Sequence, residues 1–189
     1  LTILVLGAMV MILNETALSV ALPTIMADFG IPATSAQWLL TGFLLTMGVV
    51  IPTTGFLMDK FTTRQIFLAS SGMFLAGTVL AALAPAFGVL LVGRVFQAAG
   101  TALMIPTLMT VAMTLVPPQR RGSVMGIISV VISVAPALGP TVGGFVLSMS
   151  SWHVIFWTMV PLLGLICAAG YFRLVNVGDK RDTPLDFPS

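Results

Sequence analysis

The run LTILVLGAMVMILNETALSVALPTIMA, residues 1–27, decides the fold of this chain. It contains one charged residue, Glu15, and it exceeds the roughly 20 apolar residues that an α-helix needs to cross a lipid bilayer. Further apolar runs of spanning length follow at 36–58, 65–84, 87–115, 123–148 and 152–173. The sequence therefore predicts an all-α membrane protein with six transmembrane helices.

The composition excludes several classes of protein. Of the 189 residues, 58% are hydrophobic and 7% are charged, and the mean hydropathy is +1.10, whereas about a quarter of the residues in a soluble domain are charged. A soluble globule is excluded, and the scattered basic residues give no basis for binding nucleic acid. The single cysteine, Cys167, can form no intrachain disulfide and lacks partners for a metal site. We expect no metal and no cofactor.

The basic residues predict the topology. Seven of the eight fall on one side of the predicted helices: they are Lys60, Arg64, Arg120, Arg121, Arg173, Lys180 and Arg181. By the positive-inside rule this side is cytoplasmic, as are both ends of the segment. We predict a six-helix bundle over 1–173 and a cytoplasmic linker or tail over 174–189. Because the chain starts at Leu1 inside an apolar run, we expect a partial chain and identify no signal peptide.

Two ionisable residues remain at membrane depth, Glu15 and Arg94. A charge at the bilayer centre costs about 2.5–3.5 kcal/mol on insertion scales, so such residues are functional candidates. From the helical rise, Glu15 lies roughly 18 Å and Arg94 roughly 10 Å below the outer ends of their helices. One hypothesis is that Glu15 binds and releases a proton while Arg94 tunes its pKa. The alternative is a permanent ion pair that only joins two helices.

The segment APALGPTVGG, residues 135–144, carries the next signal. Pro136 and Pro140 remove backbone donors, and Gly139 with Gly143 forms a small-residue face that allows another helix to approach closely. The pattern predicts a bent and tightly packed helix. An ordinary packing kink is the alternative interpretation.

The connection GFLMDKFTTRQ, residues 55–65, lies on the predicted cytoplasmic side. Gly55 is small enough to let helices approach, and Asp59 can accept from helix-end amides or from a basic partner. Thr62 or Thr63 can cap the helix that follows. The alternative is an ordinary tight turn that carries positive-inside charges.

These motifs together resemble the major facilitator superfamily and, within it, the fourteen-helix drug:proton antiporters of the EmrB/QacA type. The first helix is similar to the signature L-D-x-T-x-x-N-x-A-L-P over residues 13–23, and the loop to G-x-L-x-D-[RK]-x-G-[RK]-[RK]. Arg94, Gln97 and Gly100 match R-x-x-Q-G-x-G. The antiporter motif G-P-x-x-G-G is matched by Gly139, Pro140, Gly143 and Gly144. Residues 117–122 resemble P-x-x-R-[RK]-G, and Trp152, Phe156 and Pro161 fit the sixth-helix pattern.

The chain departs from the pattern at several positions. Asn14 stands where the family usually has Asp, with Glu15 beside it, an arrangement that resembles the lincomycin-resistance branch. One helical residue turns a side chain by about 100°. The other departures are Thr62, Thr63, Ala98 and His153.

The resemblance implies proton-driven export of lipophilic, often cationic, drugs by the rocking of two six-helix halves around a central cavity. This chain would supply the N-terminal half, as two inverted three-helix repeats. The implied partners are drugs, protons, membrane lipids and the C-terminal half, in a bacterial plasma membrane. Without a second half or a second copy, we expect no transport.

The resemblance also assigns expected roles to individual residues. Glu15 and Arg94 would couple protons, and the antiporter motif would seal and bend its helix. The cytoplasmic gate would be formed by Gly55, Asp59, Lys60 and Arg64. The expected substrate cavity is lined by Asn14, Gln37, Trp38, Met47, Gln97, Met104 and Met109.

Other functions are weighed against export. A proton-coupled uptake symporter of the same superfamily is one alternative, and the implied antiporter motif disfavours it. A non-transporting membrane module is another, and the charges at depth disfavour it. An enzyme is the least favoured class, because no nucleophile has a matched base and His153, the single histidine, stands at a helix end.

Overall fold

The structure is a computed structural model and describes residues 1–174. Six helices in this part of the chain are long and apolar enough to cross a membrane, which confirms the predicted number. The helices are α1 (Thr2–Phe29), α2 (Ala33–Ala36), α3 (Trp38–Lys60), α4 (Thr63–Ala82), α5 (Phe87–Leu115), α6 (Pro118–Met149) and α7 (His153–Arg173). The one-turn α2 leads directly into α3, and the two form a single span. The predicted tail, from residue 175 on, lies outside the described residues.

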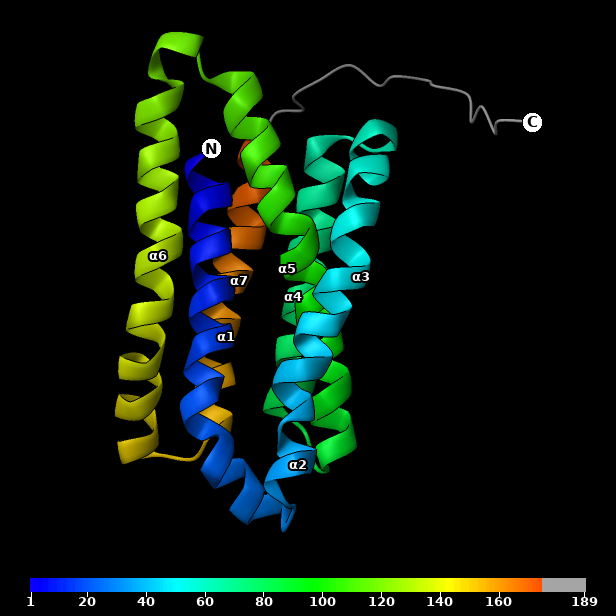
Figure 1. The fold of residues 1–189 in the computed structure, drawn as a ribbon, viewed down its shortest axis with the longest axis vertical. Coiled ribbons are helices and arrows are strands. Elements are labelled where there is room, and N and C mark those ends of the chain that lie inside the picture. The colour runs from blue at the N-terminus through cyan, green and yellow to red at the C-terminus, as the bar shows by residue number, and fades with distance from the viewer. Residues whose placement is uncertain (175–189) are drawn as a thin grey trace, which may run out of the picture.

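The bundle consists of two related sets of three consecutive spans: α1, α3 and α4 form the first set, and α5, α6 and α7 form the second. In Figure 1, α6, α1 and α3 lie across the bundle, with α7 behind α1. α1 packs against α6, α7 and α5, while α5 packs against α3, α4 and α1, and α4 also packs against α7. Exchanging α1 with α5, α3 with α6 and α4 with α7 maps these six helix pairs onto one another. This exchange is the packing expected of two three-helix repeats.

Glycines allow α4 and α5 to approach closely. A Cβ on Gly93 would lie 2.8 Å from the carbonyl oxygen of Gly77, and a Cβ on Gly100 would lie 2.6 Å from that of Ser70. Ser70 Oγ donates to the carbonyl oxygen of Gly100 over 2.7 Å. Small residues favour helix association in membranes because they bring backbones together. This seam holds α5 in place, and α5 carries Arg94.

One helix boundary differs from its prediction for a clear reason. The apolar run predicts a start at residue 123, but α6 begins at Pro118. Proline is favoured at the first helical position, where its missing N–H costs nothing. Arg120 and Arg121 are good helix formers. The helix therefore extends beyond the apolar run by about one turn.

The outer faces of the bundle are apolar. α3 and α6 are the least buried of the spans. Their large exposed side chains include Leu44, Leu45, Val49, Ile127, Val130 and Phe145. Exposed apolar surface of this extent suits lipid or a second hydrophobic partner and not water.

Candidate functional site

Arg94 lies at the centre of a buried polar network. Its side chain is fully buried on α5. Nη1 donates to Gln97 Oε1 over 2.9 Å and Nε to the carbonyl oxygen of Leu39 over 3.4 Å. The guanidinium carbon also lies 4.2 Å from the ring centroid of Phe43, a favourable cation–π distance. Residues from α3 and α5 thus hold the charge inside the bundle.

Gln97 extends this network to two more helices. Its Nε2 donates to Asn14 Oδ1 on α1 over 3.1 Å and to Thr78 Oγ1 on α4 over 2.9 Å. Because Arg94 can only donate, Gln97 must present its oxygen to Arg94 and its amide hydrogens to the other two residues. The orientation of Gln97 is therefore fixed, and so is the role of Asn14 Oδ1 as an acceptor.

Two buried donors of this network lack a partner within the described residues. They are Nη2 of Arg94 and Nδ2 of Asn14. Leaving such a group unpaired costs about 1–3 kcal/mol, and more when the group is charged. Buried polar groups without a partner call for an explanation in terms of strain, function or a bound acceptor.

Glu15 lies next to this network and does not belong to it. Its side chain is half-buried, and it interacts electrostatically with Arg94. The hydrogen bonds of Arg94 nevertheless go to Gln97 and Leu39. Among the described residues, Arg94 therefore forms no direct ion pair with Glu15 in this structure.

Residues 139–143 of α6, which lie in the expected antiporter motif, pack directly on the part of α1 that follows Glu15. A Cβ on Gly139 would overlap Oγ1 of Thr16, and a Cβ on Gly143 would lie 2.7 Å from the carbonyl oxygen of Ala17. The close approach predicted for these two glycines is present. Gly144 differs, because a Cβ there would meet no atom within 4 Å. Pro140 is exposed, and α6 continues through both of its prolines.

The connection between α3 and α4 differs from its prediction. Gly55 does not mediate a helix contact, since a Cβ there would meet nothing within 4 Å; its side of α3 faces outward. Asp59 and Lys60 are exposed. Arg64 does not pair with Asp59: its Nη2 donates to the carbonyl oxygen of Tyr171 over 2.6 Å, and its guanidinium carbon lies 4.7 Å from the centroid of that ring.

Thr62 caps α4, as one of the two sequence options predicted. Its hydroxyl oxygen accepts from the backbone N–H of Gln65, while Gln65 Oε1 accepts from the backbone N–H of Thr62. This reciprocal capping box satisfies two donors that would otherwise be unpaired at the helix start. It fixes the first turn of α4, from which Arg64 reaches α7.

The residues predicted to line a cavity fall into three environments. Gln37 and Trp38 are exposed at the start of α3, and Met47 and Met109 are half-buried. Asn14 and Gln97 are closed inside the bundle. Met104 is also fully buried, in the core, so none of these three side chains lines an open cavity in this structure. Its side of α5 meets α1 at Gly7, where a Cβ would lie 3.2 Å from Met104 Cε.

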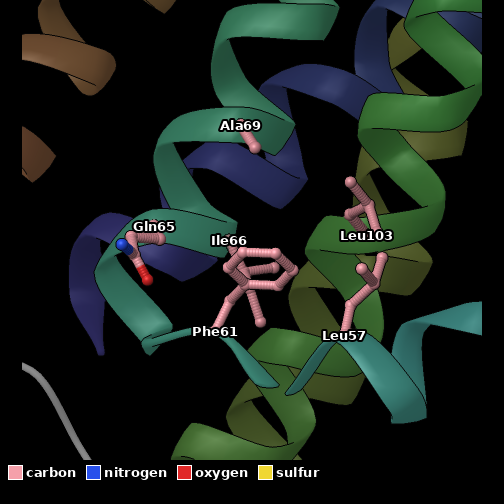
Figure 2. Close-up of a pocket in the computed structure, with 6 residues that line it drawn as sticks. All are labelled: Leu57, Phe61, Gln65, Ile66, Ala69 and Leu103. Atoms are coloured by element: carbon pink, nitrogen blue, oxygen red, sulfur yellow. The ribbon is translucent and has the colours of Figure 1, made fainter. Parts of the chain in front are cut away.

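An apolar pocket of about 280 Å³ lies where α3, α4 and α5 meet beside the α3–α4 connection. Figure 2 shows Phe61 at its centre, between Ile66 and Gln65 of α4 and Leu57 of α3, with Leu103 of α5 opposite. Its volume is just below the usual range for small-molecule sites, about 300–1,000 Å³.

A second cavity, of about 430 Å³, lies at the opposite end of the bundle. There, Trp152 Nε1 donates to Asp28 Oδ2 over 2.9 Å and joins the end of α1 to the start of α7. The ring of His153 stacks on that of Trp152. Sequence reasoning missed Asp28. Its signal was an acid at the outer end of one span and a tryptophan, able to donate, at the outer end of another.

Six spans in two exchangeable sets, with an arginine held at membrane depth, are typical of one half of a secondary transporter. A sequence profile described as Major Facilitator Superfamily matches residues 4–187. The chain therefore belongs to the major facilitator superfamily, whose members are transporters and not enzymes. It is a multi-pass membrane protein.

Similar proteins include two from Bacillus subtilis strain 168. The chain is 44% identical over 187 residues to the uncharacterized MFS-type transporter YcnB, covering 99% of this chain and 40% of that protein. It is 42% identical over 183 residues to the lincomycin resistance protein LmrB, covering 97% and 38%. The chain thus spans about two fifths of the length of these relatives.

The fold is also similar to that of solved transporters. A crystal structure of the peptide transporter POT in complex with sulfate matches with a TM-score of 0.79 at 17% identity, over 90% of this chain and 36% of that one. At this level of identity the similarity concerns the fold alone.

Proposed function

We propose that this chain is the N-terminal half of a proton-driven drug exporter. The observation that carries the proposal is the buried guanidinium of Arg94, held by Gln97 and Leu39, with the half-buried carboxylate of Glu15 within electrostatic range. Charged side chains at membrane depth are costly, so residues that carry them are functional candidates. Glu15 is free of the network's hydrogen bonds, so it can take up and release a proton without breaking them.

The direction of transport rests on two supports. Gly139 and Gly143 bring α6 against α1 at Thr16 and Ala17, so the part of α6 that matches the antiporter motif packs on the helix that carries Glu15. The chain is also 42% identical to a protein named for lincomycin resistance. Both favour export of lipophilic or cationic drugs over uptake. Export requires the rest of a longer transporter, which the C-terminal half would supply.

The proposed orientation places both chain ends of the six-helix segment in the bacterial cytoplasm. Arg64 contacts Tyr171 near the end of α7, so the α3–α4 connection and the C-terminal end of α7 lie on the same side of the membrane. Most of the basic residues belong to this side, and positive charge is retained in the cytoplasm.

Transport by the full-length protein tests the proposal. Cells loaded with ethidium should lose the dye faster when they express the protein, and dissipating the proton gradient should stop the loss. Inward accumulation driven by the same gradient would instead indicate an uptake symporter. If the purified protein moves no substrate in proteoliposomes in either direction, the non-transporting alternative replaces the proposal.

A further inference from the structure

Three consecutive residues of α1 meet three different surroundings. Asn14 contacts Gln97 of α5, Glu15 is half-buried, and Thr16 contacts Gly139 of α6. Neighbouring residues in a helix point about 100° apart. The rotation of α1 about its own axis therefore determines which of the three side chains reaches the Arg94 network.

The contact between α1 and α6 has the shape of a knob in a notch. A Cβ on Gly139 would overlap Thr16 Oγ1 and would lie 2.7 Å from Thr16 Cβ and 3.0 Å from the backbone nitrogen of Ala17. One turn further along, Gly143 leaves the same kind of space for the carbonyl of Ala17. The side chain of Thr16 thus occupies the place where any other residue at position 139 would carry its Cβ.

The knob is rigid. Thr16 is β-branched, which restricts its χ1 angle, and its hydroxyl donates to the carbonyl oxygens of Ile12 and Leu13, at 3.0 and 3.2 Å. A rigid side chain in a close-fitting notch resists rotation of the helix that carries it, because neighbouring side chains in a close-packed protein interior have little room to move.

We propose that Thr16 and Gly139 are positioning residues that fix the rotation of α1, so that Asn14 faces Gln97 and Glu15 stays outside the network. This is more than general packing, since a Cβ on Gly144 of the same segment would meet no atom of another helix in the described part of the chain within 4 Å. The consequence for proton coupling rests on the proposed function. The rotation itself does not, and it can be measured separately.

Cysteine labelling of the full-length protein measures the rotation. Ser19 is exposed and lies one turn from Glu15, whereas Leu18 is fully buried and lies one turn from Asn14. In a Cys167→Ser background, N-ethylmaleimide in detergent should label Ser19→Cys and spare Leu18→Cys. Adding Gly139→Ala should reduce labelling at position 19 and expose position 18. Gly144→Ala is the matched control and should leave the pattern unchanged.

Exchanging the knob and the notch provides the rescue. The double variant Thr16→Gly with Gly139→Ala places a methyl group in the space that Thr16 vacates. It should restore the parental labelling pattern, and also the protein level if Gly139→Ala alone accumulates poorly. An unchanged pattern in Gly139→Ala, or a double variant that behaves no better than the single one, would overturn the proposal.

Proton flux separates this proposal from the function on which it rests. Substrate-driven proton flux in proteoliposomes should fall in Gly139→Ala and recover in the double variant. If the labelling pattern shifts and recovers as expected while proton flux never changes, Thr16 and Gly139 still fix the helix, and it is the role of Glu15 that fails.

Discussion

Gln97 on α5 donates a hydrogen bond from Nε2 to Oδ1 of Asn14 on α1, over 3.1 Å. The bond joins the first helices of the two three-helix sets inside the bundle. It also explains why an amide suits position 14, where related sequences are expected to carry an acid. Asn14 accepts from Gln97 without adding a second negative charge beside Glu15. Under the proposed function, the acid–base role at this depth is therefore assigned to Glu15.

Replacing Glu15 by Gln should abolish substrate-driven proton movement while leaving the protein folded. The half-buried side chain forms no hydrogen bond in the network, so an amide of the same size is accommodated at little cost. Proton flux into proteoliposomes under a substrate gradient measures the effect. Ser19→Ala, one turn away on the exposed side, is the control. Normal flux in Glu15→Gln would refute the assignment.

Replacing Gln97 by Leu should destabilise the protein more than any exposed polar substitution. The change removes the acceptor of Arg94 Nη1 and the donor to Asn14 and Thr78. Hydrogen bonds to charged groups contribute about 1.5–3 kcal/mol each, although hydrogen bonds between membrane helices average only about 0.6 kcal/mol. We expect a loss of about 2 kcal/mol, seen as a lower thermal midpoint in detergent.

The matched control for this change is Gln37→Leu, because Gln37 is exposed at the start of α3. Its thermal midpoint should stay at the parental value. Equal midpoints for the two variants would mean that the buried network contributes nothing to stability.

The spans could be predicted from the sequence because the lipid bilayer imposes a minimum helix length. It also requires the backbone N–H and C=O groups to form their hydrogen bonds within each helix. The close approach at Gly139 could be predicted for a similar reason, since repeated small residues leave room for another helix. Gly55 shows the limit of that reasoning. A small residue permits an approach but does not cause one, and the exposed side of α3 offers no partner within the described residues.

The partners of the polar residues could not be predicted in the same way. Arg94 and Glu15 were identified by their cost in the membrane, but whether they pair depends on how α1 and α5 are rotated and shifted against each other. Asp28 and Trp152 are separated by 124 positions, and no local pattern relates them. Met104 was predicted to line a cavity from its residue type alone, whereas its helix face decides its burial.

Replacing Arg64 by Gln should loosen the end of α7. The guanidinium bonds the carbonyl of Tyr171 and lies over its ring, close to the negative end of the helix dipole. Hydrogen exchange of the backbone amides at 168–174 should become faster, with little change elsewhere. Lys60→Gln is the control, because the Lys60 ammonium is exposed and lies over the ring of Phe56 on its own helix. Unchanged exchange in Arg64→Gln would rule out this anchoring role.

Replacing Trp152 by Phe should weaken the junction between the end of α1 and the start of α7. The substitution keeps an aromatic ring against Phe29 and Phe156 but removes the N–H that donates to Asp28. A hydrogen bond to a carboxylate is worth about 1.5–3 kcal/mol when buried. Because Asp28 is exposed, solvent competes for its oxygens and we expect a loss nearer to about 1 kcal/mol.

Thermal unfolding in detergent measures this loss, and Asp28→Asn provides the comparison. An asparagine keeps an oxygen that can accept from the indole, so its thermal midpoint should fall less than that of Trp152→Phe. The double variant should lose no more than Trp152→Phe alone, since the second change then removes a charge that no longer has this donor. Additive losses would mean that the two side chains stabilise the junction independently, and that the bond between them contributes no coupling energy.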